Sequence, residues 1–318
     1  MHAQDLKLLE KMAATWPKRA TVRADFSRYA EEYTDPERRD YPLELLPFRD
    51  HPGYLSVSPE QKQRIDTWAW LVYNDRTIQS EEYLANPAFT CVMHDVFPGA
   101  DPLPLRQAVQ QCLIDEHFHT FMHLTAVAET RQFRHMHETL NCPLTITYRC
   151  LKEAQEQAPE LWQKQLLTLV FGIVAEVSVK AYLNLIAQNE EIQPKHKMVA
   201  LFHNRDESAH GQILVPVAKR LWSFMNNARR DFFIRALPKA LSAFMAQDFS
   251  AWLAILQHEE VPKAQDIIAD CQQQAEQSKI LVRDVSGIRQ LTDELDITER
   301  LDFDFSLYQA AETPCAHS

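Results

Sequence analysis

One eight-residue segment, His203-Asn204-Arg205-Asp206-Glu207-Ser208-Ala209-His210, constrains the fold of this chain more than any other. On an α-helix, His203, Glu207 and His210 stand at positions i, i+4 and i+7, so their side chains share one face. Two imidazoles and a carboxylate on one face are poor material for an apolar core, but they are suitable metal ligands. The segment therefore predicts a helix that contributes three ligands to a metal site.

A second fragment repeats this chemistry, because Glu116 and His119 lie at i and i+3. Glu-x-x-His from each of two helices, plus one Glu from each of two others, is the inward-facing ligand set of ferritin-like dimetal carboxylate bundles. Glu176 is the candidate on a third helix, since a carboxylate in an apolar run must be paired, protonated or bound to metal. Glu81 is the candidate on the remaining helix, because positions 71, 74, 78 and 81 continue one face. The neighbouring Glu82 stays an alternative.

The composition favours long helices, because only 5 of the 318 residues are glycine. Ser58-Pro59-Glu60-Gln61 is a capping box with proline at the first helical position, so a long helix should begin there. The four long helices are expected from Ser58 to about Val96 with a kink at Asn86-Pro87, from Asp101 to about Arg131, from Pro159 to about Gln188, and from near Pro194 to about Met225.

These helices predict an all-α fold in one helical domain, residues 1–318, built on a ferritin-like four-helix bundle at about 58–225. Residues 1–57 should form an N-terminal arm on the outside, helical only around Leu8–Thr15. A short helix near 148–155 should lie in the crossover. Residues 226–318 should add C-terminal helices, at 228–258 and 263–285, and a tail.

The positions of the four glutamates along the bundle support one shared site. Helices joined by a tight turn run antiparallel, so residues equally far from the turn lie level. Glu176 is 13 residues before Asn189 and Glu207 is 13 after Pro194, while Glu81 is 14 before Asp95 and Glu116 is 14 after Pro102. At about 1.5 Å per residue, each glutamate lies roughly 20 Å from its turn. All four should therefore meet at one level.

Charge and apolar runs indicate the partners. The formal net charge of −11 argues against nucleic acid, which needs a basic face. The run 166–186 is long enough for a membrane span, but Glu176 and Lys180 within it favour a central bundle helix. The N-terminal residues resemble no secretion signal, and the six cysteines form no C-x-x-C pair. We expect a cytoplasmic protein that is not bound to membranes, with a homodimer as its assembly.

Several further side chains are candidates for supporting roles. Asp115 and Asp206 are each spaced to meet a histidine on their own helix and to fix its tautomer, although solvated helix charges are the alternative. His123 stands one turn after His119. Tyr73 and Arg76 precede Glu81 and are candidates for the substrate pocket, with Arg76 pairing with a substrate carboxylate; packing and surface roles are the alternative. Four other histidines, His94, His135, His137 and His196, are expected at the surface or satisfied in loops.

Hard carboxylates mixed with imidazoles suit iron or manganese, and seven ligands are more than one ion needs. The full set resembles the ligand pattern of the diiron N-oxygenases typified by p-aminobenzoate N-oxygenase, and the third histidine, His203, is its distinguishing mark. The set comprises Glu81, Glu116, His119, Glu176, His203, Glu207 and His210.

The resemblance implies an enzyme of small-molecule biosynthesis with two iron ions per chain. Its dimetal site would use O2 to oxidise an amine to a hydroxylamine, and in some cases on to nitroso or nitro products, through a peroxo-diferric intermediate. The four glutamates would bridge or chelate the irons, and the three histidines would be terminal ligands. The substrate would be an arylamine or an amino-acid-derived amine. Electrons would come from an external donor, because the sequence has no nucleotide-binding fingerprint.

Two other classes fit the same ligands. One is a different O2-dependent dimetal enzyme, such as a C–H hydroxylase or a desaturase. The other is a non-catalytic iron-handling protein that keeps the bundle. The additional C-terminal helices favour an enzyme over storage.

Overall fold

The computed structural model describes residues 3–24, 34–278 and 284–308. Within these ranges the secondary structure is helical and has no β-strand, only an isolated bridge between Arg39 and Ile192. The predicted all-α class is therefore confirmed. The five cysteines in these ranges are free thiols, and Cys315 lies outside the described residues.

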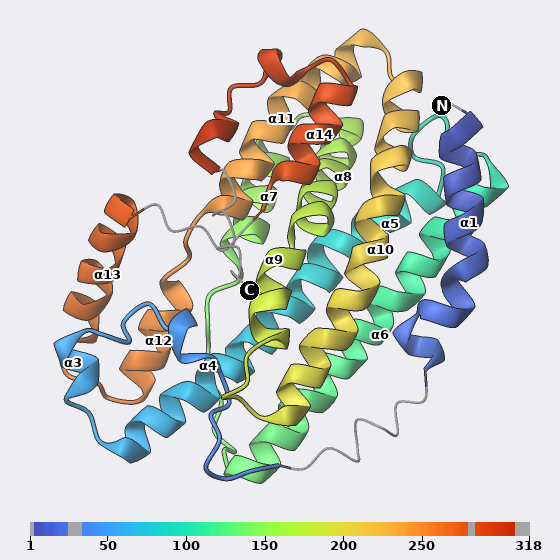
Figure 1. Ribbon diagram of the computed structural model, residues 1–318. Coiled ribbons are helices and arrows are strands. Elements are labelled where there is room, and N and C mark those ends of the chain that lie inside the picture. Colours follow the sequence, from blue (N-terminus) through green and yellow to red (C-terminus); the bar gives the residue numbers. More distant parts are fainter. Residues whose placement is uncertain (1–2, 25–33, 279–283, 309–318) are drawn as a thin grey trace, which may run out of the picture.

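Four long helical rods form the centre of the molecule (Figure 1). Short connections join the first rod to the second and the third to the fourth, and a longer crossover joins the middle two. In order, the rods are α4 (Pro59–Ser80) continued by η3 (Glu81–Ala85) and α5 (Asn86–Met93); α6 (Leu103–Arg134); α8 (Leu161–Ser178) continued by α9 (Lys180–Ala187); and α10 (Pro194–Phe224). The crossover carries α7 (Ile146–Gln157). This is the connectivity predicted for a ferritin-like bundle.

The predicted helix starts hold to within a residue or two. The Ser58 side chain accepts from the backbone N–H of Gln61, and the Gln61 side chain accepts from that of Ser58, which completes the capping box. The second rod begins one residue later than predicted, with Pro102 rather than Asp101 at the cap. The third rod is interrupted at Val179, which the sequence pattern did not predict.

Pro87 does not break the first rod, which stays helical from Pro59 to Met93. The bend predicted at Asn86-Pro87 stays a prediction. The rod widens into the π-helical segment η3 directly before this proline. A proline ring clashes with the carbonyl four residues earlier, here that of Tyr83, and this carbonyl belongs to the wider π-helical turn. The helix therefore continues through Pro87. The same turn contains Glu81, in keeping with the occurrence of π-bulges at functional sites.

The N-terminal arm is more helical than predicted. α1 (Ala3–Arg19) extends beyond Leu8–Thr15 at both ends and packs along α6 and α10 (Figure 1). It is followed by η1 (Thr21–Arg23), η2 (Leu43–Leu45) and α3 (Pro52–Leu55).

The C-terminal residues form further helices around the bundle. The helix predicted at 228–258 is divided: one helix ends at Met245, and the next begins at Ser250, whose backbone N–H donates to the Asp248 carboxylate. Part of the helix predicted at 263–285 lies outside the described residues. The elements are α11 (Asn227–Met245), α12 (Ser250–His258), α13 (Ala264–Ser278), α14 (Ser286–Glu294), η4 (Thr298–Arg300) and η5 (Phe305–Tyr308).

A buried polar layer divides the hydrophobic core in two. On α6 the first core cluster ends at Leu113 and the second begins at Met122. On α10 the second cluster ends at Ala200 and the first resumes at Ala209. Along the first and third rods, the buried apolar residues likewise belong to one cluster before the polar layer and to the other cluster after it. The predicted ligands lie at these changeovers, so apolar packing on both sides fixes the height of the layer.

Within the described residues, one helical stretch, Leu161–Ala187, is long and apolar enough to cross a membrane. Of its most apolar window, 67% is buried inside the protein. It packs against α5, α10 and α11, which is the place of a central bundle helix.

Candidate metal centre

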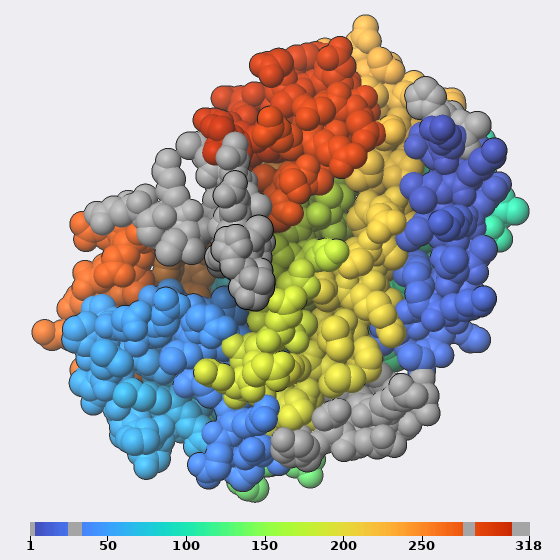
Figure 2. All heavy atoms as spheres, viewed as in Figure 1, coloured from blue at the N-terminus to red at the C-terminus, as the bar shows by residue number. Residues whose placement is uncertain are grey.

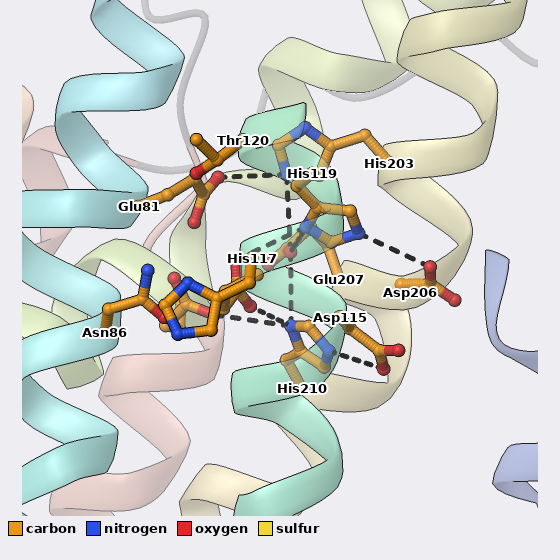
Figure 3. Close-up of polar contacts among 12 residues, drawn as sticks. Glu81, Asn86, Asp115, His117, His119, Thr120, His203, Asp206, Glu207 and His210 are labelled. Carbon is orange, nitrogen blue, oxygen red and sulfur yellow. Dashed lines mark hydrogen bonds and ion pairs between the residues drawn. The ribbon is translucent and has the colours of Figure 1, made fainter. Parts of the chain in front are cut away.

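The structure brings the seven predicted ligands together in the polar layer (Figure 3). Each is at most 5% exposed. They form two groups, in each of which one ligand atom per residue lies within 4.8 Å of all the others. The first group is Glu81, His119 and His203; the second is Glu116, Glu176, Glu207 and His210. The level predicted from residue counts therefore agrees with the structure.

Two carboxylates connect the groups. Glu207 Oε1 lies 3.5 Å from His119 Nδ1, 3.3 Å from His203 Nε2 and 3.2 Å from His210 Nδ1. Glu116 contacts His119 Nδ1 at 3.3 Å through one oxygen and His210 Nδ1 at 2.6 Å through the other. Both side chains lie where a carboxylate could bridge two cations.

Two aspartates fix the tautomers of His119 and His210. Asp206 Oδ2 lies 3.3 Å from His119 Nε2, and Asp115 Oδ2 lies 3.3 Å from His210 Nε2. A carboxylate can only accept, so each Nε2 carries the proton and each Nδ1 turns its lone pair toward the carboxylates (Figure 3). The expected pairs within one helix were wrong. Each imidazole reaches across the cluster to the facing helix, so the pairs connect α6 with α10.

His203 is held by a chain of side chains instead of an aspartate. Asn74 Nδ2 donates to the Trp70 carbonyl over 2.7 Å, which directs its Oδ1 to accept from His123 Nδ1, also at 2.7 Å. His123 Nε2 then accepts from His203 Nδ1 over 2.9 Å. His203 Nε2 keeps a free lone pair and lies 3.2 Å from Glu81 Oε1. All three imidazoles thus present a lone pair to the glutamates.

Several of the buried side-chain atoms that have no hydrogen-bond partner among the described residues gather at the same place. Those in the cluster are Glu116 Oε1, Glu176 Oε2, His203 Nε2, both Glu207 oxygens and His210 Nδ1. Close contacts between these atoms lack hydrogen-bond geometry, and an unpaired buried polar atom is costly. Lone pairs that converge on one volume are the arrangement that a bound cation satisfies. The residues therefore fit a metal centre.

The chain matches the family described as p-aminobenzoate N-oxygenase AurF over residues 3–296. It belongs to this family. The 4-aminobenzoate N-oxygenase of Streptomyces thioluteus is 42% identical over 299 residues, which cover 93% of this chain and 88% of that protein. The resemblance drawn from the ligand pattern is confirmed, and the protein is an N-oxygenase. The hydroxylase, desaturase and iron-handling alternatives are set aside.

The carboxylates of this N-oxygenase repel one another. Burial and the charge of Glu207 raise the pKa of Glu176 to about 8. Burial and the charges of Glu176 and Glu81 raise the pKa of Glu116 well above its usual range. Burial also opposes ionisation of Glu207, but when a proton occupies His210 Nδ1 in place of a metal ion, the resulting positive charge outweighs burial and holds the pKa of Glu207 well below its usual range. Four ionised glutamates therefore require added positive charge, which metal ions would supply.

The structure separates Glu81 from Glu82. Glu81 is buried and faces His203, whereas Glu82 accepts a 2.8 Å hydrogen bond from Thr120 outside the cluster. The alternative ligand Glu82 is thus not part of the two groups. His117 is exposed and lies 4.0 Å from Glu82.

The two residues predicted for the substrate pocket have protein neighbours. Tyr73 is buried and stacks on Trp70, and its hydroxyl has no hydrogen-bond partner among the residues that the structure describes. Arg76 forms a 3.0 Å ion pair with Asp248. A carboxylate of the protein itself therefore already pairs with one of the guanidinium N–H groups that a substrate carboxylate would need. Their role toward a substrate stays a prediction.

His196 was expected at the surface or in a loop, and this was wrong. It lies in the first turn of α10, is 5% exposed, and stacks on Trp70 with ring centroids 4.0 Å apart. Its Nδ1 donates to the Asp40 carbonyl, and its Nε2 accepts from Thr130. It is a satisfied core histidine.

Asn74 is a supporting residue that the sequence analysis missed. A signal for it was present, because position 74 shares a helix face with Glu81. A fully buried amide on that face has to be hydrogen-bonded, and here it orients His123.

Proposed function

We propose that this N-oxygenase holds two iron ions between the seven side chains and uses O2 to oxidise the nitrogen of an arylamine. The observation that supports this most directly is the convergence of three imidazole lone pairs and unpaired carboxylate oxygens in one buried layer. Two divalent ions would also balance the charge of the four glutamates. The mixture of hard carboxylates with imidazoles favours iron, with manganese as the alternative.

In this proposal each residue has a defined task. Glu116 and Glu207 would lie between the two ions, while Glu81 would serve the first group and Glu176 the second. His119, His203 and His210 would be terminal ligands, each with its proton held on the far nitrogen. Once bound, reduced iron would supply the electrons that activate O2. The apolar cores on both sides would keep bulk water from the layer.

The proposed reaction consumes an external reductant. An arylamine, O2, two electrons and two protons give the arylhydroxylamine and water, with one oxygen atom forming the new N–O bond. The second oxygen leaves as water. A flavin reductase, a ferredoxin or a chemical reductant would supply the electrons. Further rounds would carry the product to the nitroso and nitro levels.

We propose an aromatic amine as the substrate because the relative from Streptomyces thioluteus is named for its action on 4-aminobenzoate. The test is anaerobic loading with Fe(II), followed by O2 and a panel of amines, with mass detection of the products. We expect hydroxylamine or nitro products from arylamines. Turnover of amino-acid-derived amines alone would contradict the aromatic class. Fewer than two irons per chain would contradict the centre.

We also propose a homodimer. Ile114, Phe121 and Leu124 lie along one face of α6 and are 38%, 57% and 53% exposed. An apolar stripe of this kind is typical of a protein interface. Sedimentation of the parent and of a Phe121→Glu variant tests it. A monomeric parent would contradict the proposal.

A further inference from the structure

The N-terminal arm contacts the aspartate that orients His210. The indole Nε1 of Trp16, near the end of α1, lies 2.9 Å from both carboxylate oxygens of Asp115. Asp115 is fully buried, and its other partner is His210 Nε2 at 3.3 Å. Trp16 and Asp115 are 99 residues apart in the chain.

The same arm contacts the aspartate that orients His119. The backbone N–H of Thr21, at the start of η1, lies 3.1 and 3.3 Å from the two oxygens of Asp206. The Thr21 hydroxyl donates to the Phe202 carbonyl and accepts from Arg205, which fastens this turn to α10. Asp206 is also fully buried, and its other partner is His119 Nε2.

The two arrangements have the same construction. In the described part of the chain, each aspartate lies between one imidazole and one N–H group from the arm. The two histidines belong to different ligand groups, His119 to the first and His210 to the second. Figure 2 shows α1 lying against α10 at the surface of the molecule. One short segment of the arm therefore reaches both halves of the centre.

We propose that Trp16 and Thr21 are positioning residues that act through Asp115 and Asp206 and set the affinity of each metal position separately. The inference rests on the proposed dimetal function. A buried carboxylate keeps its orientation only while its lone pairs are satisfied. Without the arm N–H, the aspartate has one partner and holds its histidine less firmly. Outer partners of this kind typically change metal affinity by about 10–100-fold.

Trp16→Phe tests the second position, since it removes the N–H and keeps an aromatic ring. The probe is Co(II), titrated anaerobically into the full-length protein and followed by visible absorption, with two equivalents expected for the parent. Trp16→Phe should weaken one equivalent by about tenfold and leave the other unchanged. Leu9→Ala is the control, because it removes a buried α1 side chain without touching Asp115.

Thr21→Pro tests the first position. Proline removes the N–H, and the extended backbone of Ala20 before it (ψ 134°) is compatible with a following proline. Thr21→Val is the matched control, since it loses only the hydroxyl. We expect Thr21→Pro to weaken binding of the Co(II) equivalent that Trp16→Phe leaves unchanged. Thr21→Val should bind both Co(II) equivalents as the parent does.

The outcomes separate the two proposals. A parent that binds fewer than two Co(II) ions overturns the proposed dimetal function. If the parent binds two Co(II) ions, the positioning role is overturned when Trp16→Phe and Thr21→Pro both bind Co(II) with the same two affinities as the parent. Equal weakening of both equivalents, reproduced by Leu9→Ala, also overturns it, because the effect would then come from α1 packing. If Trp16→Phe melts well below Leu9→Ala, its role is structural and the proposal fails. A double variant that combines Trp16→Phe with Asp115→Asn tests the route through Asp115. If its loss of Co(II) affinity differs from the sum of the two single losses, the result supports that route.

Discussion

His123 accepts a hydrogen bond from His203 over 2.9 Å, and this bond determines which nitrogen of His203 faces the glutamates. Burial, together with the positive charges that His203 and His119 carry when they are protonated, holds the pKa of His123 well below its usual range, so His123 is the neutral acceptor. A residue that binds no metal in our proposal thus orients His203, which we propose as the third imidazole ligand.

A pair of variants at position 123 tests this relationship. His123→Phe removes the acceptor and leaves the His203 proton free to move to either nitrogen, so metal affinity should fall by about 10–100-fold. His123→Gln keeps an acceptor oxygen and should lie closer to the parent. Fe(II) binding isotherms measured anaerobically provide the comparison. Equal affinities for the Phe and Gln variants would show that the hydrogen bond does not matter.

Metal binding should depend on pH through Glu176. Its pKa is raised to about 8, first by burial and then by Glu207. Below this pH the carboxyl holds a proton that a metal ion must displace, so Glu176 should contribute about a tenfold fall in affinity per pH unit as pH decreases from 8 to 6, in addition to the protons released by the other side chains of the site. Glu176→Gln removes this proton and should show a shallower dependence. The measurement is Fe(II) or Co(II) affinity against pH, and identical slopes for the two proteins would contradict it.

The sequence predicted which seven side chains converge in the polar layer because their spacing is local. That they bind metal stays a prediction. Within the 203–210 segment, helix periodicity alone places three side chains on one face, and residue counts from the turns place Glu81 and Glu176 level with them. The apolar run around Glu176 identified it as a candidate, because a carboxylate there must be paired, protonated or bound to metal.

The surroundings of the ligands could not be predicted in the same way. Trp16 and Thr21 meet Asp115 and Asp206 across 99 and 185 residues, and no periodicity relates such positions. The aspartates were assigned to their own helices because spacing along one helix says nothing about a facing helix. The π-helical turn that contains Glu81 was also not predicted, because the spacing of apolar residues along a helix does not show where the helix widens.

His196 should contribute to the pH dependence of stability. Burial, only partly offset by Asp40, lowers its pKa to about 4. A depressed pKa favours the folded state above the unfolded value of about 6.5, and this contribution is lost as pH falls toward 4. The loss should be about 3 kcal/mol. In urea unfolding, the stability difference between the parent and His196→Gln should shrink by that amount between pH 6.5 and 4. A constant difference would contradict the shift.

His203→Ala should separate metal binding from N-oxidation. Six ligands remain, so the fold and part of the metal content should persist, while amine oxidation should fall by at least tenfold. Circular dichroism and metal analysis give the first two quantities, and product detection by mass gives the third. His117→Ala, which removes an exposed histidine from the same region, is the control and should behave like the parent. An active His203→Ala variant would show that the third imidazole is not required.

Gly172 should test how closely α8 and α5 must approach beside the centre. A Cβ at Gly172 would lie 2.3 Å from the Cβ of Ala88, and Gly172 stands one helical turn before Glu176. Alanine in a helix gains about 1 kcal/mol over glycine, but overpacking costs about 1–3 kcal/mol, so Gly172→Ala should be net destabilising. Adding Ala88→Gly removes the clash and exchanges the two residues, so the double variant should return to within about 1 kcal/mol of the parent. Urea unfolding gives the stabilities, and Co(II) titration shows whether the wider spacing also displaces Glu176. Gly172→Ala at or above parental stability would show that the two helices can separate without cost.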